Sequence, residues 1–245
     1  MIDPYAQAAD AIEKAGLVIA LTGAGISVES GIPDFRGPDG IWVKHPPERY
    51  ASISAYLEDP DRVWQFWVKL ARMCRNCKPN AAHGALAVLE HAGLLHAVIT
   101  QNVDNLHQDA GSRRIIEYHG NARWLVCLKC GARDPFDLER PPERAPHCQC
   151  GGLKKPDVVM FGETIPADAL LEAEVLAVQC DVALVIGTSA QIYPAAEIPL
   201  TAKRHGAFVV EANIQRTDLT PAVTDTFLEG PAATTVPKLA AMLTP

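Results

Sequence analysis

The sequence has no long hydrophobic segment and no excess of basic residues. Its 22 Lys and Arg residues stand against 29 Asp and Glu residues, a formal net charge of −7, and this balance argues against a nucleic-acid groove as the main function. No apolar run approaches the length of a membrane span, and the first ten residues, MIDPYAQAAD, lack the basic and apolar regions of a secretory signal. We therefore expect a cytoplasmic protein that binds neither nucleic acid nor membranes. We also expect it to be a monomer.

A third glycine is missing from the glycine-rich turn near the N-terminus. Residues 17–21, LVIAL, are typical of a short strand buried on both faces, and Gly23-Ala24-Gly25 follows closely. The dinucleotide fingerprint G-x-G-x-x-G would place another glycine at Val28, so this turn alone is weak evidence for a nucleotide site. The following loop, Pro33-Asp34-Phe35-Arg36-Gly37, combines an acid, an aromatic ring and a guanidinium, which predicts a polar ligand.

Four further apolar runs end, like the first, in polar or small residues. The carboxyl ends of parallel strands meet at one edge of an α/β sheet, where ligands bind. The repetition therefore predicts one crevice lined by five loops. The four runs are Leu94–Thr100 before Gln101-Asn102-Val103-Asp104, Ile115–Tyr118 before His119, Asp181–Ile186 before Gly187-Thr188-Ser189, and Phe208–Ala212 before Asn213.

The segments between these runs differ in composition. Residues 62–72 have apolar and aromatic side chains at helical spacing, which predicts a packed helix of an inserted module; an aromatic substrate entrance is the alternative. Residues 122–156 are rich in Arg, Pro and Cys and are too few for a core of their own. We predict an α/β fold with two domains. They are a Rossmann-like parallel-sheet domain of residues 1–36, 80–121 and 157–245, and a small domain of a helical module, 37–79, and a zinc ribbon, 122–156.

Four of the seven cysteines form two close pairs. Cys127-Leu-Lys-Cys130 and Cys148-Gln-Cys150 resemble a zinc ribbon, in which four thiolates surround one Zn²⁺ ion and glycines allow tight turns. The second pair is C-x-C rather than C-x-x-C, and His147 beside it is an alternative ligand. With four protein ligands the metal has no open position, so we expect a structural role.

Three cysteines lie outside these pairs. Cys74 and Cys77 end the predicted aromatic helix with no partner pair nearby, so we interpret them as ordinary cysteines, with a redox pair as the alternative. Cys180, beside an apolar run, is interpreted as a small core residue.

The chain contains, in this order, GAGISVESGIPDFRG, TQNVDNLH, the histidine of YHG, the four paired cysteines, KPDVVMFGE and GTSAQIYPA. In this combination the motifs resemble the sirtuins, the NAD-dependent protein lysine deacylases, and the resemblance extends from Leu17 to about Ala232. It implies a Rossmann-like domain and a zinc-ribbon domain, with NAD and an acyl-lysine substrate meeting between them. NAD is then a co-substrate, and one structural zinc ion is expected per chain.

The resemblance also implies roles for particular residues. His119 matches the catalytic base of the family, and Asn102 and Asp104 match catalytic residues of its nicotinamide and ribose pocket. Residues matched to NAD contacts are Gly23, Ala24, Gly25, Asp34, Phe35, Arg36, Gln101, Asn102, Asp104, Gly187, Thr188, Ser189, Asn213, Ile214 and Ala232. Residues matched to substrate contacts are Val159, Met160, Phe161, Gly162, Glu163 and Ile192; Val158–Glu163 and Gln191–Tyr193 resemble two strands between which a peptide adds by backbone pairing.

These residue types suit the implied reaction. Cleavage of the glycosidic bond of NAD develops positive charge on the ribose, which Asn102 and Asp104 can stabilise. His119 is suited to take a proton from a ribose hydroxyl, because the pKa of histidine lies near neutrality. The implied products are nicotinamide, free lysine and O-acyl-ADP-ribose.

One departure from the family pattern concerns the acyl group. Sirtuins that prefer succinyl- or malonyl-lysine carry Tyr-x-x-Arg in the helical module, where this sequence has Trp67 and Leu70. Without the arginine an anionic acyl group would be buried unpaired, so we predict removal of acetyl or longer neutral groups unless Lys69 or Arg72 compensates. The alternatives are a desuccinylase or demalonylase, an NAD-dependent ADP-ribosyltransferase or NAD hydrolase, and an NAD-sensing module without turnover.

Overall fold

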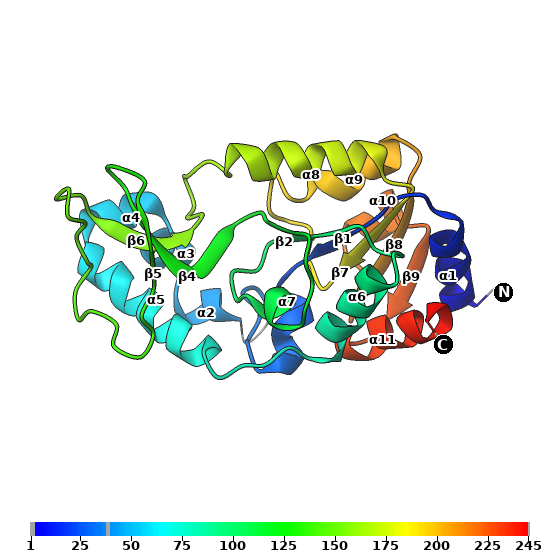
Figure 1. Ribbon diagram of the computed structural model, residues 1–245, viewed down its shortest axis with the longest axis horizontal. Coiled ribbons are helices and arrows are strands. Elements are labelled where there is room, and N and C mark those ends of the chain that lie inside the picture. Colours follow the sequence, from blue (N-terminus) through cyan, green and yellow to red (C-terminus); the bar gives the residue numbers. More distant parts are fainter. Residues whose placement is uncertain (1–2, 38–39, 245) are drawn as a thin grey trace.

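The computed structural model describes residues 3–37 and 40–244, and a six-stranded parallel sheet forms its centre (Figure 1). The strand order is β3-β2-β1-β7-β8-β9, and every neighbouring pair is parallel. The chain thus builds the sheet outward from β1 in one direction and from β7 in the other, the doubly wound arrangement. The strands are β1 (Val18–Thr22), β2 (Ala97–Thr100), β3 (Ile115–Glu117), β7 (Val182–Ile186), β8 (Phe208–Asn213) and β9 (Thr226–Glu229).

Helices cover both faces of this sheet, so the central strands are buried along their whole length. One face packs against α1 (Pro4–Lys14), α6 (Ala81–His91) and α11 (Ala232–Leu243), and the other against α8 (Ala167–Gln179) and α9 (Glu197–Arg204) (Figure 1). A short 3₁₀ helix (Ala24–Ser30) follows β1. Helix α7 (Leu106–Asp109) lies between β2 and β3, and α10 (Leu219–Ala222) lies between β8 and β9. No helix in the described ranges 3–37 and 40–244 is long and apolar enough to cross a membrane.

Residues of the helical module and of the cysteine-rich segment pack in one hydrophobic cluster. The ring of Trp64 lies 5.1 Å from that of Phe136, and its Nε1 donates to the carbonyl oxygen of Pro142 at 2.8 Å. The remaining elements of this region are an antiparallel sheet, β4 (Gly120–Cys127), β5 (Arg133–Pro135) and β6 (Lys154–Val158), and helices α2 (Ile41–Lys44), α3 (Pro47–Tyr50), α4 (Ile53–Glu58) and α5 (Pro60–Cys74). The domain boundaries given above stay a prediction.

The structure corrects the interpretation of the two substrate segments as strands. Of Val158–Glu163, only Val158 belongs to a strand, and Phe161 makes an isolated bridge with Ser52. Gly162, at φ +90°, turns the chain away, and the N–H of Glu163 donates back to the carbonyl oxygen of Met160. Gln191–Tyr193 is irregular too, since Ala190 before it has a positive φ and Pro194 after it has no N–H to donate.

Candidate functional site

A cavity of about 1030 Å³ lies at the carboxyl ends of the strands on either side of the reversal in strand order. Its lining includes His119 and every other residue matched to NAD or acyl-lysine except Asp104. These are Gly23, Ala24, Gly25, Asp34, Phe35, Arg36, Gln101, Asn102, Gly187, Thr188, Ser189, Asn213, Ile214 and Ala232 for NAD, and Val159–Glu163 and Ile192 for the substrate. Asp104 lines an adjoining cavity of about 560 Å³, which shares Phe35, Trp67 and Asn102 with the first.

Glycines let two loops meet by their backbones at the centre of the sheet. The N–H of Gly25 donates to the carbonyl oxygen of Gly187 at 2.8 Å, and a Cβ at Gly25 would lie 2.7 Å from the Cα of Gly187. Gly187 itself has φ +58°, which a side chain would strain. Close packing of these loops therefore requires the glycines, while Val28, at the position of the absent third glycine, is exposed on the cavity wall.

Side-chain hydrogen bonds connect three of the loops that line the cavity. Nε2 of Gln101 donates to the hydroxyl of Thr188 at 3.1 Å, and Nδ2 of Asn213 donates to the carbonyl oxygen of Thr188 at 3.0 Å. Asn213 also accepts from the N–H of Ile214 at 2.9 Å. The polar residues at the carboxyl ends of β2, β7 and β8 thus form one connected wall.

The loop of residues 33–37 shapes itself and contacts the opposite wall. The carboxylate of Asp34 accepts from the N–H of Gly37 at 2.9 Å, and the ring of Phe35 lies 5.0 Å from that of Trp42. The guanidinium of Arg36 donates to the side-chain oxygen of Gln191 at 3.3 Å, and burial lowers the pKa of Arg36. Gln191 was predicted only as part of a substrate segment, and its contact with Arg36 arises because the fold brings it opposite this loop.

Asn102 and Asp104 converge on Ser27, which the sequence analysis had not assigned to the site. The hydroxyl of Ser27 donates to the carboxylate of Asp104 at 2.7 Å and accepts from Nδ2 of Asn102 at 3.1 Å. Asp104 also accepts from the N–H of Leu106 at 2.9 Å. Burial raises the pKa of the Asp104 carboxyl, and these hydrogen bonds oppose that rise.

His119 is held as a neutral base. Its Nδ1 lies 3.1 Å from the carbonyl oxygen of Gln101, which can only accept, so Nδ1 carries the proton. Nε2 therefore keeps its lone pair, and it has no hydrogen-bond partner among the described residues, although the ring lines the larger cavity. Burial lowers the pKa of His119, partly opposed by the bond to Gln101, so the ring is unprotonated at neutral pH.

Two buried histidines contact residues next to Asn102 and Asp104. Nε2 of His107 lies 2.9 Å from the hydroxyl of Thr22, and Nε2 of His83 lies 3.5 Å from the hydroxyl of Ser27. The two imidazole rings are 4.9 Å apart. Burial lowers the pKa of His83 to about 4 and that of His107 to about 3, so neither imidazole ring carries a charge at neutral pH.

The substrate side of the cavity is anchored by a buried ion pair that the sequence did not reveal. Nζ of Lys155 lies 2.9 Å from the carboxylate of Glu163 and donates to the carbonyl oxygen of Val158 at 2.6 Å. The same carboxylate accepts from the N–H of Met160 at 2.9 Å. Glu163 thus holds its own segment in place, while Phe161 is left partly exposed in the cavity.

The helical module presents apolar residues to the site. Trp67 lines both cavities and Leu70 lines the smaller one. Lys69 and Arg72, the two cations named above as substitutes for the absent arginine, are exposed and lie outside both linings.

Cys74 and Cys77 line the smaller cavity. Burial raises the pKa of Cys74 to about 12 and also raises that of Cys77, so both thiols stay protonated at neutral pH. This favours their interpretation as ordinary cysteines. Cys180 is buried beside the sheet, as expected of a core residue.

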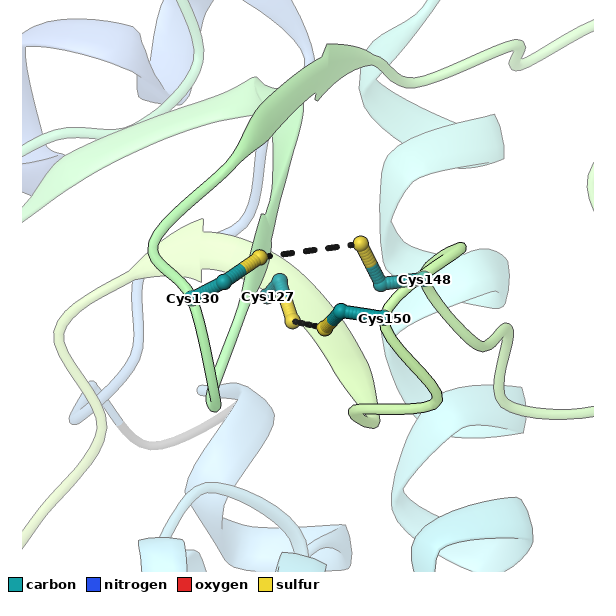
Figure 2. A group of neighbouring side chains, drawn as sticks. All are labelled: Cys127, Cys130, Cys148 and Cys150. Atoms are coloured by element: carbon teal, nitrogen blue, oxygen red, sulfur yellow. Dashed lines mark hydrogen bonds between the residues drawn. The ribbon is translucent and has the colours of Figure 1, made fainter.

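The four paired cysteines form a site with the dimensions of a zinc centre (Figure 2). The Sγ atoms of Cys127 and Cys150 are 3.6 Å apart, those of Cys130 and Cys148 are 3.7 Å apart, and all four lie within 4.8 Å of one another. A tetrahedron with Zn–S bonds of about 2.3 Å has S–S edges of about 3.8 Å, so the set fits one Zn²⁺ ion. His147 is not part of this cluster; its backbone pairs with Leu153.

The comparisons with known proteins agree with this geometry. The model of the Sir2 family matches residues 23–194. A protein of Thermococcus kodakarensis named "NAD-dependent protein deacylase" is 46% identical over 240 residues, which is 95% of this chain and 93% of that protein.

Two solved structures extend the similarity to the fold. A structure described as a Sir2 homolog–NAD complex superimposes with a TM-score of 0.93 and 40% identity, covering 99% of this chain and 94% of that one. Sir2Tm bound to a propionylated peptide superimposes with a TM-score of 0.84 and 34% identity, covering 95% of each chain. The family model and the Thermococcus relative each cover most of the sequence, and they show that the chain belongs to the Sir2 family, the sirtuins.

Proposed function

We propose that this protein is an NAD-dependent protein lysine deacylase that removes acetyl and other neutral acyl groups, releasing nicotinamide, free lysine and O-acyl-ADP-ribose. The observation that carries the proposal is His119: a neutral imidazole with a free Nε2 lines the cavity that also holds the glycine loop and the polar ends of the strands. A sensing module has no need of a base there.

The residues around the cavity fit NAD. The glycine loop and the connected wall of Gln101, Thr188 and Asn213 offer backbone and amide groups to phosphate and ribose. When bound, NAD supplies the glycosidic bond that is broken and the ribose that accepts the acyl group. Asn102 and the Ser27–Asp104 pair orient and stabilise the nicotinamide end.

His119 acts at a defined atom. Its Nε2 takes the proton of a ribose hydroxyl, and the hydrogen bond from Nδ1 to the carbonyl oxygen of Gln101 stabilises the imidazolium that results. Since burial lowers its pKa, His119 is ready to accept this proton throughout the neutral range.

The preference for neutral acyl groups rests on the lining of the smaller cavity beside Trp67 and Leu70. The cations among its described lining residues are Arg75 and Arg123. Both are engaged, Arg75 with Glu139 and Arg123 with a carboxylate on α7. A succinyl carboxylate would therefore have to displace an existing ion pair or stay unpaired, at a cost that acetyl avoids.

The test follows acetyl-lysine and succinyl-lysine forms of one peptide by mass spectrometry, with and without NAD, using the wild type and His119→Ala. We expect NAD-dependent loss of acetyl in the wild type alone, with succinyl removed much more slowly. Preference for succinyl would refute the acyl assignment. Nicotinamide release without deacylation would move the function to ADP-ribosyl transfer or NAD hydrolysis, and NAD binding without turnover would leave a sensing module. The monomeric state and the cytoplasmic location stay predictions from the sequence.

A further inference from the structure

A buried carboxylate that the deacylation chemistry does not use lies on β8, whose last two residues line the larger cavity. Glu211 on β8 is 1% exposed, and no lysine, arginine or histidine of the described residues forms an ion pair with it. A buried carboxylate without hydrogen bonds would be strongly destabilising. Its acceptor capacity is instead met by hydroxyl groups.

Three threonine hydroxyls donate to Glu211, and all three come from the chain that follows β8. Thr217 donates to Oε1 at 2.6 Å, while Thr220 and Thr224 donate to Oε2 at 2.7 and 2.8 Å. Hydrogen bonds to an ionised acceptor are roughly twice as strong as neutral ones. One side chain of the sheet thus holds residues 217–224 at three points.

The segment held in this way begins in the wall of the cavity, where Thr217 and Asp218 are lining residues. Residues 214–218 line it next to Asn213, which belongs to the same strand as Glu211. The guanidinium of Arg216 lies 4.9 Å from the ring centre of Phe227, the residue beside Glu211 on the neighbouring strand. Both contacts fix the segment to the sheet beside Asn213 and Ile214. These two residues match the family's contacts to the adenine ribose, so under the proposed function this is the adenosine end of the NAD site.

We propose that Glu211 is a positioning residue for NAD: through three threonine hydroxyls it fixes the segment that binds the adenosine half of the cofactor. The inference rests on the proposed function. This hydrogen-bond arrangement requires a side chain at position 211 with two acceptor oxygens and no donor, because each carboxylate oxygen accepts at least one O–H. Glutamine, of the same size, offers an NH₂ in place of one oxygen, so at least one threonine hydroxyl must turn away.

The test compares Glu211→Gln and Thr224→Val with a matched control, Thr226→Val. Thr224 contacts Glu211 but is not a lining residue of the cavity, whereas the buried hydroxyl of Thr226, two residues on, donates to Gln7. The measurements are KM for NAD, kcat, KM for an acetyl-lysine peptide, and calorimetric Kd values for NAD and ADP-ribose.

We expect Glu211→Gln to raise KM and Kd for NAD roughly tenfold and Thr224→Val to raise them about threefold. The Kd for ADP-ribose should rise by the same factors, because the loss is at the adenosine end. Values of kcat at saturating NAD and of KM for the peptide should stay within about twofold of the wild type. Thr226→Val should leave every constant within about twofold.

The inference is overturned if Thr224→Val weakens NAD no more than Thr226→Val, or if the variants lose thermal stability while Kd for NAD is unchanged. Should Glu211→Gln fail to fold, the two threonine variants alone decide the outcome. Absence of deacylation by the wild type would refute the proposed function instead. The calorimetric values would then still report on Glu211, so the two failures can be distinguished.

Discussion

Lys155→Met is expected to destabilise the protein more than any exposed lysine substitution. The Lys155 side chain is 6% exposed and that of its partner Glu163 is 21% exposed, with Nζ 2.9 Å from the carboxylate. Methionine fills a similar volume, so the change removes the charge and its hydrogen bonds rather than the packing. Glu163 is then left with a single N–H donor, from Met160.

The size of the loss follows from this burial. Removing one partner of a buried ion pair costs about 3–5 kcal/mol. Because Glu163 keeps some solvent and the N–H of Met160, the lower part of this range applies, about 3 kcal/mol. In a chain of this length that corresponds to a fall in Tm of about 6–12 °C.

A double variant separates the cost of the unpaired charge from the cost of the lost Lys155 hydrogen bonds. In Lys155→Met/Glu163→Gln no charge remains, so we expect about 1–2 kcal/mol of the loss to be recovered. The control is Lys154→Met: Nζ of Lys154 lies 2.6 Å from Asp134, whose side chain is 49% exposed, and such a pair contributes little.

The assays are denaturant unfolding and peptide kinetics. The segment that Lys155 anchors lines the substrate side, so KM for the acetyl-lysine peptide should rise several-fold while KM for NAD is unchanged. A loss in Lys155→Met no larger than in Lys154→Met, or a double variant no more stable than the single one, would refute the reasoning.

Three further predictions concern the base, the metal and the acyl group. Burial lowers the pKa of His119, so kcat/KM should stay level as the pH is lowered from 8 to about 6.5, the usual histidine pKa. It should fall only at more acidic pH, where Nε2 becomes protonated. A kcat/KM that already falls between pH 8 and pH 7 would contradict this. Cys148→Ser should lose the one zinc ion per chain and unfold the small antiparallel sheet, as measured by metal analysis and circular dichroism, whereas Cys77→Ser should keep its zinc. The double variant Trp67→Tyr/Leu70→Arg should raise kcat/KM for a succinyl-lysine peptide at least about tenfold over the wild type. The uncharged control, Trp67→Tyr/Leu70→Gln, should show no such increase. Equal kcat/KM values for the two variants would show that the acyl carboxylate does not reach this position.

Local sequence pattern is enough to specify several features of this protein. Short apolar runs became the central strands, because a run of β-branched residues buried on both faces has few alternatives. Asn80 caps α6, its side chain accepting from the N–H of Ala82 at 2.9 Å, and asparagine before an apolar helical run is a local signal for a helix start. The cysteine spacing likewise specified the metal cluster, since close pairs of thiols on tight turns need little else to converge.

Tertiary structure decided the features that depend on distant partners. The outer strand β9 is only four residues long and escaped the sequence analysis. Val159–Glu163 is apolar enough to resemble a strand, yet Gly162 and the Lys155–Glu163 pair turn it into an anchored loop. No local signal connects Ser27 with Asp104, or Glu211 with three threonines, because those contacts exist only after the sheet has assembled. Pattern specifies which groups reach the crevice; packing decides which of them meet, and so which can act together.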